Sequence, residues 1–311
     1  MTDARLQDLT SDGGAVEYSK AADPIASGAT PAMPIREFPP SLHEGLESGV
    51  VDLDLSGDLG CDGPATSPGL LASFLVAGGE ELLLPDACAT SQLWFALRGS
   101  GTLLVGGEEL PYGPRDLITL PACGEVRVRA AEASTFYRVH DGPLLRYLGV
   151  SPAEPRFRPT LYPWAKVQAE VQAALDDPES ASRSRVSVLL TNRHFPGTMT
   201  VTHVLWAMIG VVPPRTDQLP HRHQSVALDL ILECEPGCYS LVSREVDSRG
   251  DLVDPVRVPW RPGGAFTTPP GYWHSHHNES GSPAFLMPIQ DAGFQTYLRT
   301  LDIRFHPETR H

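Results

Sequence analysis

Two histidine-rich stretches decide how this chain is interpreted: Pro220-His221-Arg222-His223 and Pro269-Pro270-Gly271-Tyr272-Trp273-His274-Ser275-His276-His277-Asn278. His221 and His223 are two residues apart, so on an extended strand both imidazoles project from the same face. Two imidazoles from one strand and a third from a later strand form a set of nitrogen ligands that leaves positions open on a divalent metal. Isolated histidines are mostly surface or core residues, but this clustering at strand spacing favours a metal site.

The spacing of these residues resembles the two motifs of cupin barrels. The first motif places His-x-His on one strand, and the second reads Gly-x5-Pro-x-Gly-x2-His-x3-Asn. The second motif is matched without a gap by Gly263, Pro269, Gly271, His274 and Asn278. The resemblance implies that His221, His223 and His274 are the metal ligands. The glutamate that many cupins place shortly after His-x-His is absent, because Ala227 and Leu228 stand there, so a three-histidine site is implied.

Over about residues 195–305 the chain is similar to the gentisate and salicylate 1,2-dioxygenase group. The matching segments are Leu205-Trp206-Ala207, Pro220 to His223, Ala227-Leu228, Thr268-Pro269, Trp273-His274 and Leu301-Asp302-Ile303. This resemblance implies an all-β fold of two tandem cupin barrels (double-stranded β-helices) joined by a linker helix. It also implies a non-haem oxidoreductase that uses Fe(II) and dioxygen to cleave the ring of a small molecule. Mn, Ni and Zn remain alternative metals.

The chain departs from this group at two pocket positions. The group has an arginine for the substrate carboxylate six residues after the second motif-one histidine, where this chain has Asp229. It also tends to have a glutamine where this chain has Gly210. A carboxylate facing the cavity would repel an anionic substrate, so gentisate itself is disfavoured and a neutral or amine-bearing ring is expected. The alternative is that Asp229 pairs with an arginine, Arg222 or Arg244.

Other candidate residues surround the predicted metal site. His276 matches a retained pocket position and is the best candidate for proton transfer, since an unperturbed imidazole titrates near neutrality. Asp229 is a second candidate catalytic and substrate-binding group. Trp206 and Trp273 are expected to form apolar walls, with ordinary packing as the alternative, and Gly210 lies beside them in the predicted substrate pocket. Asn278, Ser275 or backbone carbonyls are expected to orient the ligands.

Composition and charge limit the classes of protein that fit. The chain has 311 residues, with 30 prolines, 28 glycines and a net charge of −14. Short strands joined by tight turns explain this composition, and the negative charge argues against nucleic-acid and anionic membrane partners. The N-terminus shows no secretory signal, and five cysteines at no metal-binding spacing are expected as reduced thiols. A cytoplasmic location is therefore expected.

We divide the chain into a flexible arm (1–35), a metal-free N-terminal barrel (36–155), a linker (156–185) and a metal-binding C-terminal barrel (186–311). The first barrel lacks ligands because Gln92 and Val126 stand at the matching motif positions. A helix is predicted from Pro163 to Asp177, where apolar residues recur at helical spacing.

Two other classes of function stay open. One is a non-oxidative metal enzyme, such as an isomerase or decarboxylase, and the other is a bicupin that only binds a small molecule. In each case the partner is a small molecule, joined by dioxygen for an oxygenase. The resemblance also implies a homo-oligomer, either a dimer or a tetramer.

Overall fold

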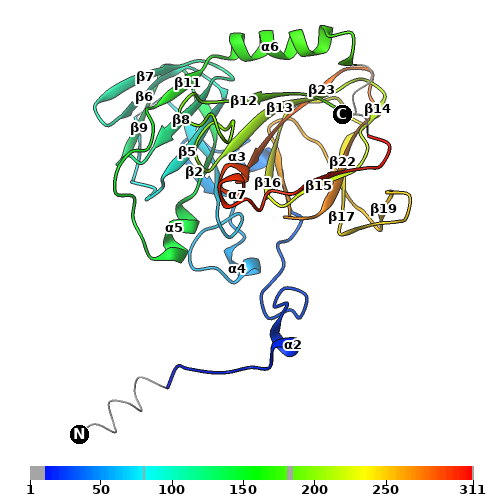
Figure 1. The fold of residues 1–311 in the computed structure, drawn as a ribbon. Helices are drawn as coiled ribbons and strands as arrows, with labels where there is room; N and C mark the ends of the chain where they lie inside the picture. The colour runs from blue at the N-terminus through cyan, green and yellow to red at the C-terminus, as the bar shows by residue number, and fades with distance from the viewer. Residues whose placement is uncertain (1–10, 80, 181–184, 310–311) are drawn as a thin grey trace, which may run out of the picture.

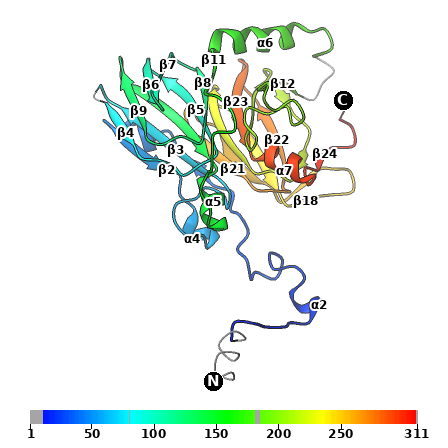
Figure 2. The ribbon, with the colours of Figure 1, turned by 60° about the vertical axis from the view of Figure 1, so that its left-hand side comes forward.

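The chain folds into two β-barrels that lie side by side, with a long helix across one end (Figures 1 and 2). The structure is a computed structural model and describes residues 11–79, 81–180 and 185–309. Residues 1–10 of the expected arm and residues 181–184 of the expected linker lie outside the described residues. The two barrels and the linker helix between them confirm the all-β fold predicted from the sequence.

The first barrel consists of a six-stranded sheet, in the order β11-β8-β5-β10-β3-β2, and a four-stranded sheet, in the order β4-β9-β6-β7. All pairings within it are antiparallel. Its strands are β2 (Gly49–Asp52), β3 (Leu71–Ala77), β4 (Leu82–Leu84), β5 (Ser91–Arg98), β6 (Gly101–Val105), β7 (Glu108–Tyr112), β8 (Leu117–Pro121), β9 (Val126–Ala130), β10 (Ser134–His140) and β11 (Thr160–Tyr162).

The second barrel has a six-stranded sheet, β1-β21-β16-β23-β13-β12, and a facing sheet, β20-β17-β22-β15-β24, in which β14 also pairs with β22. A small hairpin, β18–β19, projects from it. The strands are β1 (Glu37–Phe38), β12 (Val186–Leu190), β13 (Trp206–Val212), β14 (Thr216–Asp217), β15 (His221–His223), β16 (Ala227–Glu233), β17 (Cys238–Ser243), β18 (Glu245–Val246), β19 (Leu252–Val253), β20 (Val256–Pro259), β21 (Ala265–Thr268), β22 (Trp273–Asn278), β23 (Ala284–Gln290) and β24 (Ile303–Phe305).

The two six-stranded sheets repeat the same strand order, so β5, β10 and β3 correspond to β16, β23 and β13. The residues after β10 and β23 support this correspondence. Asp141 accepts hydrogen bonds from the backbone of Thr90 and Ser91, and Asp291 accepts one from the backbone of Val226. A short helix follows each of these aspartates, so the two barrels are structural repeats of each other.

In the described residues, helices connect or flank the barrels: α2 (Tyr18–Ala21), α3 (Ser41–Glu44), α4 (Ser56–Leu59), α5 (Gly142–Leu148), α6 (Trp164–Asp176) and α7 (Ala292–Leu298). The predicted linker helix is α6, and it begins one residue after Pro163. Its apolar stripe buries Val167 and Val171. It lies between the end of β11 and the start of β12, which matches the predicted role of joining the barrels (Figure 1).

The largest hydrophobic core lies between the barrels, because the outer faces of the two six-stranded sheets pack on each other. Phe74, Phe95 and Tyr137 of the first barrel share this core with Leu228 and Ile289 of the second. Two smaller cores fill the barrel interiors. The central strands are therefore covered on both faces, by the barrel interior on one face and by the other barrel on the opposite face. This explains their nearly continuous apolar sequence.

Residues 198–205, which precede β13, form turns: Met199 has a positive φ, and the Thr202 hydroxyl accepts hydrogen bonds from the backbone of Val204 and Leu205. In the N-terminal segment, residues 11–31 project away from the barrels (Figures 1 and 2). Met33 is nevertheless buried, and β1 then joins the sheet of the second barrel.

The five cysteines are free thiols. Among the helices of the described ranges, none combines the length and the apolar character needed to cross a bilayer.

Candidate metal centre

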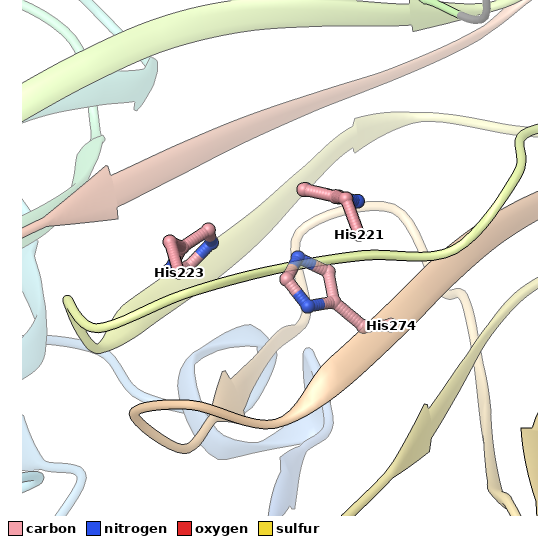
Figure 3. A group of neighbouring side chains, drawn as sticks. All are labelled: His221, His223 and His274. Carbon is pink, nitrogen blue, oxygen red and sulfur yellow. The ribbon is translucent and has the colours of Figure 1, made fainter. Parts of the chain in front are cut away.

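Three histidines converge inside the second barrel, and neighbouring strands bring them together (Figure 3). His221 and His223 lie at the two ends of β15, and His221 pairs directly with His274 of β22. The turn before β22 is tied to β15, because the backbone N–H of Gly271 donates to the carbonyl of His223 over 2.7 Å. Gly271 has a φ of +77°, a conformation that favours glycine. The motif glycine therefore sets the approach of the third histidine.

One ring nitrogen from each of these histidines lies within 4.8 Å of the others. The ring centroids of His221 and His274 are 3.9 Å apart, and those of His223 and His274 are 4.9 Å apart. All three side chains are buried. The three histidines that the sequence motifs single out are therefore adjacent in the folded chain.

Backbone hydrogen bonds indicate which ring nitrogen carries the proton in His223 and His274. Nδ1 of His223 donates to the carbonyl of Ser225, and Nδ1 of His274 donates to the carbonyl of Tyr272. These contacts place the proton on Nδ1 and leave Nε2 as an acceptor. The backbone carbonyls orient two of the ligands, whereas Asn278 bonds to backbone carbonyls of a turn and Ser275 bonds to His277.

His221 has an acceptor at Nε2 as well, because the guanidinium of Arg185 donates to it over 2.9 Å. Its Nδ1 is buried and has no hydrogen-bond partner in the described chain. Burial, and next the charge of the neighbouring groups, holds the pKa of His221 well below 6.5, and burial lowers the pKa of His223 to about 4. The cluster is therefore neutral at pH 7 and offers nitrogen lone pairs.

This donor set fits a divalent transition metal. Neutral imidazoles suit Fe, Zn, Cu and Ni, and three protein ligands leave further positions for substrate or dioxygen. His221, His223 and His274 form the one such group of potential ligands found in the described residues, and no carboxylate belongs to it. A bound metal would take the Nε2 lone pair that Arg185 contacts here.

A cavity of about 200 Å³ opens beside the three histidines. Both His221 and His223 form part of its wall. Of the other residues predicted for the pocket, Trp206, Gly210 and His276 also line it. The indole N–H of Trp206 is buried without a partner among the described residues, so it is available to a bound molecule.

The protonation of His276 is set by a chain of hydrogen bonds from outside the cavity. The indole N–H of Trp260 donates to the hydroxyl of Ser240 over 2.9 Å, and that hydroxyl contacts Nδ1 of His276 over 2.8 Å. The Ser240 hydroxyl has one proton, and Nδ1 of His276 is the acceptor that it contacts within the described residues, so we assign this proton to the Ser240–His276 bond. Nε2 of the neutral ring therefore carries the proton, and burial lowers the pKa of this histidine to about 3.

Two predicted residues do not line the cavity. Asp229 is 2% exposed, and its carboxylate accepts a hydrogen bond from Thr268 over 2.9 Å. It is not paired with either arginine considered from the sequence: Arg222 contacts Asp302, and Arg244 contacts Tyr272. Trp273 lies beneath the guanidinium of Arg222, which is 5.7 Å from the centre of its ring.

Three residues of the site were not predicted from the sequence. Arg185 precedes β12 and lines the cavity, with Nε and one terminal nitrogen buried and without partners in the described chain. Burial lowers its pKa to about 10, so it remains a cation at pH 7. Ser240 and Trp260 act through His276. No sequence motif marks these three, because each reaches the site from a strand or strand end remote from the histidine motifs.

Comparisons with known proteins identify the fold. No protein-family model and no curated protein matches the sequence. Among solved structures, the chain resembles salicylate 1,2-dioxygenase from Pseudaminobacter salicylatoxidans, with a TM-score of 0.72, 14% identity, and coverage of 98% of this chain and 97% of that one. A structure of the same enzyme with gentisate adducts has a TM-score of 0.72 and 13% identity, covering 99% and 95%.

A third similar structure is a Cupin 2 conserved barrel domain protein from Leptotrichia buccalis, with a TM-score of 0.50 and 14% identity, covering 82% of this chain and 96% of that one. The salicylate dioxygenase structures cover both barrels with nearly full mutual coverage. The chain therefore has the two-barrel cupin fold seen in salicylate 1,2-dioxygenase.

Proposed function

We propose that this protein is a metal-dependent dioxygenase that cleaves the ring of a small aromatic substrate carrying an acidic group. The observation that supports this most is a cavity beside the three-histidine group whose wall includes Arg185, with Nε and one terminal nitrogen of its guanidinium unpartnered in the described chain. Fe(II) is the metal that the resemblance favours. Once bound, it would supply open coordination positions and the electrons that dioxygen chemistry requires.

The substrate class follows from the charges that line the cavity. The expectation of a neutral or amine-bearing ring depended on Asp229 facing the cavity, but Arg185 is the charged residue that lines it. Guanidinium groups hold carboxylates through paired hydrogen bonds. We therefore assign to Arg185 the anion-holding role that the family arginine, replaced by Asp229, would have had.

The remaining cavity residues would orient the ring and supply a proton. Trp206 offers an indole N–H next to an apolar surface that suits an aromatic ring. His276 presents a protonated Nε2, so it begins as a donor and stabilises developing negative charge on a substrate oxygen. Gly210 adds no side chain to the cavity wall, and a Cβ there would come within 3.0 Å of Leu286.

Pairs of rings that differ only by a carboxylate test this assignment. Salicylate against phenol, and a hydroxyanthranilate against an aminophenol, would be compared by dioxygen uptake with the Fe(II)-loaded protein. We expect the wild type to prefer the carboxylated member. Arg185→Met should raise KM for that member about 10- to 100-fold, the value of a hydrogen bond to a charged group, with metal content measured for each variant.

Arg222→Met is the matched control, because Arg222 lies on β15, next to two of the histidines, and contacts Asp302 rather than the cavity. Preference for the uncharged or amine-bearing ring, unaffected by Arg185→Met, would instead support the original interpretation of Asp229. Full metal loading without dioxygen uptake on any ring would favour non-oxidative chemistry or simple binding.

A further inference from the structure

The interior of the first barrel contains a buried cation, Arg138, that forms no ion pair within the described ranges. Arg138 of β10 is 8% exposed, and its Nε is buried without a hydrogen-bond partner in the described chain. The guanidinium lies over Trp94, 5.5 Å from the centre of the ring. Burial lowers its pKa to about 10, so the group is still charged at pH 7. An unpaired buried charge is costly, so natural proteins rarely keep one without a partner.

The neighbours of Arg138 do not supply that partner. Asp52, whose charge favours the guanidinium, accepts a hydrogen bond from Ser73 and forms no ion pair with Arg138 within the described ranges. Gln92 is also occupied: its carbonyl accepts from the indole of Trp94, and its amide contacts the thiol of Cys123. Burial raises the pKa of this thiol to about 11, so Cys123 brings no negative charge.

A second donor lies on the same face of the same strand. His140 is two residues from Arg138, and its Nδ1 accepts from the backbone N–H of Gly142. That bond leaves the proton on Nε2. Burial, and next the charge of Arg138, keeps the pKa of His140 well below 6.5, so the ring is neutral. With 5% of its surface exposed, His140 is close to solvent, like Arg138. Arg138 and His140 therefore offer hydrogen-bond donors and a positive charge, but no negatively charged acceptor.

The location of the pair corresponds to the cavity of the second barrel. β10 corresponds to β23. The last residues of the two strands, His140 and Gln290, immediately precede Asp141 and Asp291, the two aspartates that accept hydrogen bonds from a neighbouring backbone segment. Arg138 therefore corresponds to Pro288, and both Pro288 and Gln290 line the cavity beside the three histidines. In the first barrel, the equivalent wall carries the guanidinium of Arg138 and the imidazole N–H of His140 in place of Pro288 and Gln290.

We propose that the first barrel binds a small carboxylate at Arg138 and His140. A planar carboxylate forms paired hydrogen bonds with a guanidinium, and its charge would neutralise Arg138. The indole of Trp94 would hold the guanidinium in place from the other side. This site does not depend on the chemistry proposed for the second barrel, and its test does not use enzymatic activity.

Acetate binding to the metal-loaded, full-length protein tests the proposal. All measurements would use an Arg185→Gln background, which removes the guanidinium of the second barrel. We expect a saturable rise in Tm with acetate, beyond the effect of equal chloride, and a matching signal in calorimetric titration. Arg138→Gln should remove the saturable response, and Arg138→Lys should weaken it, since an ammonium cannot make the paired contact.

His140→Phe gives an independent test, because it removes one donor and leaves the charge of Arg138 in place. We expect it to weaken acetate binding at least tenfold without lowering the metal content of the second barrel. The proposal is overturned if the Arg185→Gln protein shows no saturable acetate response. It is equally overturned if that response persists unchanged in Arg138→Gln or His140→Phe.

Discussion

At the residue scale, hydrogen bonds determine which ring nitrogen carries the proton in three histidines near the candidate metal centre. The carbonyls of Ser225 and Tyr272 place it on Nδ1 of His223 and His274, and the hydroxyl of Ser240 contacts Nδ1 of His276. Sequence reasoning found the histidines because their spacing is local to two strands. It could not assign their protons, because the groups that orient them come from backbone carbonyls and from strands elsewhere in the barrel.

The role of His276 can be separated from that of its neighbour His277. Replacing His276 by Phe removes the Nε2 proton donor, and we expect turnover to fall about 100-fold or more, the usual contribution of a positioned acid or base, with Fe(II) stoichiometry unchanged. His277→Gln is the matched control, because His277 bonds to Asp217 and Ser275 and does not line the cavity. Steady-state dioxygen uptake gives both values, and equal losses in the two variants would contradict the assignment.

Asp229 makes stability depend on pH. Burial raises the pKa of its carboxyl from 3.8 to about 7, against the opposing hydrogen bond from Thr268. Between these values the folded state holds a proton that the unfolded state has released, so stability is greatest at low pH and falls as pH rises through 7. One pKa unit corresponds to about 1.4 kcal/mol, so the ionised carboxylate costs the fold up to about 4 kcal/mol.

Asp229→Asn keeps the size of the side chain and removes this ionisation. We expect the variant to gain stability relative to the wild type at pH 8.5 and to lose most of that advantage at pH 4, close to the ordinary pKa of an aspartate, as measured by urea unfolding at both values. A difference between the two proteins that does not change with pH would show that Asp229 does not titrate in this range.

At the element scale, the second barrel includes a strand from a segment that precedes the first barrel in the sequence. β1 comes from the segment before the first barrel, yet it pairs with β21 and takes the edge position that β11 has in the first barrel. The two-residue strand has no detectable alternation, so the sequence could not indicate its partner. The linker helix was predictable, because the apolar spacing from Trp164 to Leu175 is local and Pro163 and Pro178 bound it.

One buried hydroxyl holds β1 in place. The side chain of Thr267 accepts from the backbone of Arg36 over 2.8 Å and donates to the carbonyl of Pro34 over 2.9 Å. Thr267→Val leaves both backbone groups without this partner, which costs about 1–3 kcal/mol each when they remain buried. We expect faster hydrogen exchange and proteolysis of residues 30–38 in this variant, whereas Thr267→Ser should behave like the wild type. Unchanged exchange would mean that other contacts hold the segment.

At the scale of the whole molecule, one fold repeats twice with different contents. The strand order and the capping aspartates are shared, but only the second barrel carries the three-histidine group found in the described residues. The sequence predicted the two barrels and, from motif spacing, the three histidines that converge in the second barrel. The sequence could not show that Arg185 lines the cavity and that Asp229 does not. Both positions depend on packing between residues that are distant in the sequence. A dimer or tetramer stays a prediction.

The central claim is that the second barrel uses its metal to insert dioxygen into a ring. The most direct measurement is turnover of a carboxylated aromatic substrate by Fe(II)-loaded protein under ¹⁸O₂, with His223→Ala as the control and mass spectrometry of the product. We predict one dioxygen consumed per ring opened, both labelled atoms in the product, and no turnover by the variant. Stoichiometric metal with product formed without label, or turnover that survives His223→Ala, would contradict it.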